Sequence, residues 1–131
     1  MASKIRAIKA YCPRIELGKT AQLDELVGYL ADRTGLNEGE IRMVMTELRD
    51  AVVFFNRTGR GVKLEGLGIY APKIDLEGNF GVSHRLDKRI ENELNAPGAF
   101  SGDIINRENI GKTSDDLVAL WNEEHPDDPV T

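Results

Sequence analysis

The sequence has one cysteine, two histidines and one tryptophan among 131 residues, and its net charge is negative. A lone Cys12 can form neither an internal disulfide nor a cysteine-based zinc site. The longest apolar run, residues 51–55, is far too short to span a bilayer. The first eleven residues contain no apolar core of a signal peptide. We therefore expect a cytoplasmic protein with no membrane association.

The net charge of −5 and the pI near 5.1 argue against a nucleic-acid partner. The charges, however, are segregated along the chain. Residues 1–19 carry a net charge of +4 and residues 57–73 carry +3, whereas the last nineteen residues carry −6. This distribution allows a basic surface on an acidic molecule.

Apolar periodicity predicts two consecutive helices. The first has an apolar stripe from Leu23 to Ala31, with Thr20 as N-cap and Gly35 as its end. The second opens at Asn37, which with Glu40 resembles a capping box, and its stripe runs from residue 41 to residue 55. This stripe is longer than the first helix can cover, so a sheet or a second subunit must cover the remainder.

The rest of the chain predicts a small sheet and two further helices. We expect extended structure over residues 4–17, one strand over residues 62–74, and short strands over residues 79–85 and 103–107. We expect a short helix over residues 85–95 and a final helix that Thr113 or Ser114 caps. His125 should contact the last carbonyls of that helix, and residues 127–131 should form a solvated tail.

Two glycine-containing motifs resemble nucleotide loops but lack the required context. Gly66, Gly68 and Ala71 have the spacing of a dinucleotide fingerprint, yet strand residues follow where a helix should begin. Residues 106–113 resemble a Walker A loop, but Asn106 replaces its first glycine. The two histidines are far apart in the sequence. We therefore expect no cofactor, no metal, no small-molecule substrate and no enzymatic activity.

The order of these features resembles the HU and integration-host-factor family of bacterial DNA-bending proteins. The segment "ELVGYLADRTGLNEGEI" resembles its first two helices, "LEGLGIY" its strand signature, and "NIGKTSDDLVALW" the turn that opens its C-terminal helix. The resemblance implies an α+β fold with an N-terminal helical hairpin, a small antiparallel sheet and a C-terminal helix, in an intertwined homodimer. It also implies that Gly66 and Gly68 are packing glycines.

The resemblance divides the chain into an N-terminal strand segment (1–19), an HU-like domain (20–124) and an acidic tail (125–131). It places double-stranded DNA at two matching lysines, Lys73 and Lys112. On charge and proximity we add four arginines and lysines as DNA-binding residues: Arg85, Lys88, Arg89 and Arg107.

The family's long basic arm has no counterpart in residues 74–103, which contain more acids than bases and no proline at a hairpin tip. Two functions therefore stay open. The first is sequence-tolerant DNA binding in the nucleoid by a dimer, through phosphate contacts. The second is a protein-interaction or assembly module on the same fold without DNA binding. We favour the first.

Overall fold

The computed structural model describes all 131 residues, which form two compact units. Unit 1 comprises residues 1–19 and 101–131, and unit 2 comprises residues 20–100. Along the chain, unit 2 is therefore inserted into unit 1. Residues 101–124, predicted as part of the HU-like domain, pack with the N-terminal residues instead. None of the helices combines the length and the apolarity that crossing a bilayer requires.

Unit 2 begins with the two predicted helices, α2 (Leu23–Thr34) and α3 (Glu38–Arg57). Thr20 does not cap α2; the N-cap is Gln22, whose carbonyl accepts the first backbone bonds of the helix. Gly35 ends α2 in a left-handed conformation, as predicted. The Asn37 side chain caps α3 by accepting the Glu40 N–H at 2.8 Å. Val27 and Ile41 are buried in the pair.

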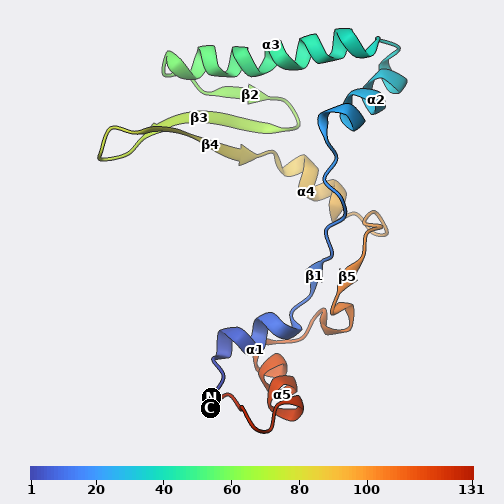
Figure 1. Cartoon of the computed structure of the whole chain (residues 1–131), viewed down its shortest axis with the longest axis vertical. Coiled ribbons are helices and arrows are strands. Elements are labelled where there is room, and N and C mark those ends of the chain that lie inside the picture. Colours follow the sequence, from blue (N-terminus) through green and yellow to red (C-terminus); the bar gives the residue numbers. More distant parts are fainter. The chain divides into compact units, whose positions relative to one another are not determined.

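The sheet of unit 2 has the order β2-β3-β4 and is antiparallel throughout (Figure 1). Its strands are β2 (Val62–Leu64), β3 (Gly68–Ile74) and β4 (Phe80–Leu86), and helix α4 (Lys88–Leu94) follows. The prediction of one strand over residues 62–74 was wrong. Gly66 lies at the third place of a turn that the Leu67 N–H closes on the Leu64 carbonyl, and its φ of 78° requires glycine.

Gly68, in contrast, is required by a close approach between strands. A Cβ atom at this position would lie 2.3 Å from the Arg85 carbonyl oxygen and 2.7 Å from His84 Nε2, and its φ is 151°. The two glycines of the "GLG" segment therefore have different roles. Gly66 makes the β2–β3 turn, and Gly68 lets β3 and β4 pack closely.

Unit 1 pairs helix α1 (Lys4–Tyr11) with helix α5 (Ser114–Glu124). The expectation of extended structure over residues 4–17 was wrong for α1, which Ser3 caps by accepting the Arg6 N–H. The apolar face of α1 is small and its charged residues obscure the helical period in the sequence. The face is recognised only from its packing against α5. Strand β1 (Arg14–Ile15) pairs with β5 (Ile104–Ile105), so the predicted strand at 103–107 is confirmed in its central residues.

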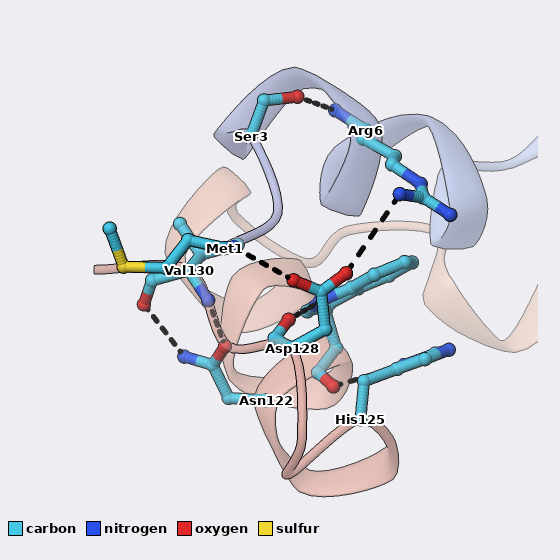
Figure 2. A network of polar contacts seen from close by, with 8 residues as sticks. Met1, Ser3, Arg6, Asn122, His125, Asp128 and Val130 are labelled. Atoms are coloured by element: carbon cyan, nitrogen blue, oxygen red, sulfur yellow. Dashed lines mark hydrogen bonds and ion pairs between the residues drawn. The ribbon is translucent and has the colours of Figure 1, made fainter.

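The C-terminal residues are not a solvated tail, because they pack against α5 and α1 (Figure 2). Trp121 is 4% exposed, and its Nε1–H donates to the Asp128 carbonyl at 2.7 Å. Arg6 lies 3.8 Å from the Asp128 carboxylate. Asn122 exchanges two hydrogen bonds with Val130. The His125 ring stacks on Trp121, and its backbone N–H bonds the Trp121 carbonyl, as predicted for the helix end.

The segment that resembles a Walker A loop holds the C-terminal end of α1. Its 3₁₀ turn η1 (Arg107–Asn109) is flanked by Asn106, whose amide donates to the carbonyls of Ala10 and Cys12. Asn109 is 3% exposed and donates to the Tyr11 carbonyl at 2.7 Å. Thr113 then caps α5 in a reciprocal box with Asp116. The side-chain amides of Asn106 and Asn109 are therefore engaged by backbone carbonyls at the end of α1.

We predict that Gly68→Ala destabilises unit 2 by at least about 2 kcal/mol, because it combines a strained φ with steric overlap against a backbone carbonyl. The matched control is Gly28→Ala in α2, where the nearest atom is 3.9 Å from the new Cβ. That control should stabilise by about 0.5–1 kcal/mol. Urea denaturation measures both. An unchanged midpoint for Gly68→Ala would contradict the close approach.

We also predict that the hydrogen bond between Tyr11 of α1 and Glu124 of α5 is lost above pH 10. The Tyr11 hydroxyl donates to Glu124 at 2.5 Å, which raises the tyrosine pKa from 10.0 to about 12. The folded pKa is higher than the unfolded one, so this contribution is complete below pH 10 and is lost as the pH rises to 12. The free energy of unfolding, measured against pH for the natural chain and Tyr11→Phe, should converge over that range. A constant difference up to pH 12 would contradict it.

Candidate nucleic-acid interface

The strand register of unit 2 sorts its side chains onto two sheet faces. Residues paired across antiparallel strands lie on the same face, and neighbours along a strand alternate. The charged face carries Lys63, Ile69, Ala71, Lys73, Gly81, Ser83 and Arg85. The apolar face carries Val62, Leu64, Gly68, Tyr70, Pro72, Ile74, Phe80, Val82, His84 and Leu86.

The apolar face is turned towards α3. Pro72, Ile74, Phe80 and Val82 line a groove of ≈ 750 Å³ together with Val52 and other residues of α3, and Lys73 and Gly81 also border it. The charged face therefore lies on the opposite side of the sheet, away from the helix. Asn56 fixes this arrangement, because its amide donates to the carbonyls of Arg60 and Tyr70 at 2.9 and 3.2 Å.

Cations dominate the charged face. Lys73 and Arg85 have no carboxylate within 4 Å. Lys63 lies 3.7 Å from Glu65, but both side chains are more than half exposed, so the attraction is weak. Three cations on one face, with small or apolar residues between them, form a surface suited to a polyanion.

Two carboxylates lie at the ends of this face, and both accept hydrogen bonds from nearby backbone N–H groups. Asp75, in the β3–β4 turn, accepts the N–H groups of Glu77 and Asn79, and these bonds, led by that from Asn79, lower the pKa of its carboxyl. Asp87 caps α4 by accepting the Arg89 N–H at 2.8 Å. Their charges are thereby directed at local N–H groups.

The structure brings together some of the six predicted DNA-binding residues and separates others. Lys73 and Arg85 share the charged face. Lys88 and Arg89 follow in α4, and the Arg89 guanidinium lies beside the Gly66 turn. Two residues belong to the other unit: Arg107 in η1 and Lys112 next to α5. Lys112 lies close enough to Asp116 to contribute to the lowered pKa of that carboxyl, after the larger effect of the Thr113 N–H.

Sequence reasoning missed Lys63 as a member of this surface. Read as one strand, residues 62–74 alternate without a break. Once the Gly66 turn folds them into a hairpin, Lys63 pairs with Ile69, and Ile69 pairs with Arg85. The "EG" dipeptide between two apolar segments was the available signal for that turn.

Unit 2 leaves much apolar surface uncovered. Val27 and Ile41 are its only buried apolar side chains larger than alanine. On α3, Met43, Val44 and Phe54 are 58–62% exposed, and on the hairpin Phe80 is 84% exposed. Exposed apolar surface of this extent is typical of a protein–protein interface. No group of three or more His, Cys, Asp or Glu side chains is placed to hold a metal ion.

We predict that Asn56→Asp destabilises unit 2 by about 1–3 kcal/mol at pH 7, because a carboxylate would face two carbonyl oxygens that the amide now satisfies. Part of the loss should be recovered as the pH falls and the new carboxyl is protonated. Thermal unfolding at pH 7 and pH 4 measures both effects, with Asn122→Asp in unit 1 as a comparison. A loss that does not depend on pH would contradict this role for Asn56.

A comparison with curated proteins gives no match. A family model, in contrast, matches residues 3–92, which is more than half of the chain. Its description is "HU domain fused to wHTH, Ig, or Glycine-rich motif". The match covers α2, α3 and the whole sheet with its charged face, and it supports the HU-like resemblance of these elements. By this match, the chain belongs to the HU-HIG family of HU-domain proteins.

Proposed function

We propose that this chain is a sequence-tolerant, architectural DNA-binding protein that acts as a homodimer. The observation that carries the proposal is the charged face, where Lys63, Lys73 and Arg85 project from three adjacent strands and only Lys63 has a carboxylate within 4 Å. Cations spaced along a sheet suit the phosphates of a duplex. Since phosphate contacts position a protein without reading bases, we expect little sequence preference. The proposal involves no catalytic step.

The dimer is supported by the uncovered apolar surface of unit 2. The groove between α3 and the β3–β4 hairpin is apolar, and the exposed apolar residues of α3 continue beside it. Asn56 Oδ1 is buried there with no hydrogen-bond partner. A second copy would cover this apolar surface, and the dimer would then carry two charged faces, one from each subunit.

The second candidate is a protein-interaction module without DNA binding. Unit 2 has three more carboxylates than cations, and acids flank the tip of its hairpin at Asp75 and Glu77. These charges repel a polyanion at long range. We favour DNA because the acids lie on helices, turns and caps, whereas the sheet face presents cations.

The double variant Lys73→Gln/Arg85→Gln should weaken binding to a random duplex and flatten its dependence on salt. Four phosphate contacts per dimer would be lost, so the log–log slope should become shallower by up to about 3.6. The control is Arg33→Gln/Arg49→Gln, which removes the same charge from the helices. Equal losses in the two variants would mean that net charge, and not the charged face, governs binding. A natural chain that does not bind at about 50 mM salt would favour the interaction module.

A further inference from the structure

The free edge of β4 is a strand-pairing surface, and we propose that it pairs antiparallel with the β4 edge of a second copy. The first observation is the hydrogen-bond pattern of β4. Asp75 N–H bonds the Asn79 carbonyl, and Asp87 N–H bonds the Leu67 carbonyl. These two bonds mark the ends of the ladder, and every second residue pair between them is hydrogen-bonded. Gly81, Ser83 and Arg85 belong to the hydrogen-bonded pairs, so their backbone N–H and C=O groups point at β3.

It follows that the other residues of β4 direct their backbone groups away from β3. These residues are Phe80, Val82, His84 and Leu86. No other strand pairs with that side of β4 in the chain, and no backbone bond to another segment satisfies it. Four N–H and four C=O groups are therefore left in a regular row, which is the template that another strand requires.

The β4 edge also has few of the features by which edge strands usually avoid pairing, since Arg85 is its one arginine or lysine. It is seven residues long and contains no proline and no lysine. The opposite edge of the sheet, β2, is only three residues long and carries Lys63. Pro72, which cannot donate a hydrogen bond, lies on the central strand beyond the end of β2. Only the β4 edge is therefore suited to pairing.

The sequence of β4 indicates that a second copy is the occupant, because the strand is complementary to itself. With a twofold axis at Ser83, Phe80 lies opposite Leu86 of the other copy, and Val82 lies opposite His84. Arg85 lies opposite Gly81, so the two arginines stay about 13 Å apart along the strands. All seven residues pair, with no like charges directly opposed. An axis at Val82 or His84 would leave residues of the strand unpaired.

Such pairing would join two three-stranded sheets into one of six strands. The charged faces would then be continuous over about 24 Å, with Lys63, Lys73 and Arg85 contributed by each copy. The exposed Phe80 and Leu86 side chains would pack on each other on the opposite face. This inference rests on the proposed dimer and specifies one contact within it.

The test is disulfide formation at position 83 in the full chain carrying Cys12→Ser. An antiparallel pair that is not hydrogen-bonded has Cα atoms about 4.5 Å apart, within reach of a disulfide. Ser83→Cys should therefore shift to a covalent dimer on mild oxidation. The control Ala71→Cys lies on the same face of the central strand, opposite Ser83, and should stay monomeric on a non-reducing gel.

A second variant tests the edge without a cysteine. Val82→Pro removes an N–H from the free edge and none from the β3–β4 ladder, so it should lower the extent of self-association while the circular dichroism spectrum is preserved. The solution mass of the natural chain tests the dimer separately from this contact. A dimeric mass without cross-linking at position 83, or equal cross-linking at position 71, would overturn the β4 pairing and leave the proposed dimer intact.

Discussion

The close approach of β3 to β4 at Gly68 is the constraint on which unit 2 depends. A side chain there would overlap the Arg85 carbonyl, so only glycine permits the observed register. A slip of one residue would move every side chain of a strand to the opposite face. The register places Lys73 and Arg85 on one side and Pro72, Val82 and their neighbours on the side of α3. The separation of charge from apolar surface is therefore a consequence of strand pairing.

The same register explains why unit 2 is incomplete as a single chain. An amphipathic sheet and a twenty-residue helix cover each other only in part, and several of their large apolar residues, Phe54 and Phe80 among them, remain more than half exposed. Unit 1, in contrast, has a core of its own around Trp121, and its segregated charges are partly compensated where Lys4 and Arg6 meet Asp115 and Asp128. Two cations of the basic N-terminal segment are thus paired with acids of the C-terminal segment, whereas Lys73 and Arg85 of the charged face have no carboxylate within 4 Å.

Local signals predicted the parts of the fold that local interactions determine. The stripes of α2 and α3, the Asn37 cap and the Thr113 cap could be read from spacing alone. Helix α1 could not, because its apolar face is defined by contacts with residues more than a hundred positions away. The Gly66 turn was hidden by an alternation that continues through it, and Lys63 was missed with it. Lys112 was added to the DNA-binding residues by resemblance and Arg107 by charge and proximity in the sequence, whereas both belong to unit 1.

The most direct test of DNA binding by the charged face is a titration of the isotopically labelled protein with a random DNA duplex. Nuclear magnetic resonance spectra recorded during the titration show which residues respond. We predict that the largest chemical-shift changes occur at the Arg85 side-chain N–H and at the backbone amides of the charged face, from Lys63 to Arg85. The solvent-exposed face of α3 and the residues of α5 should change little. Changes concentrated on α1 or α5, or no change at low salt, would contradict the assignment of DNA binding to this sheet.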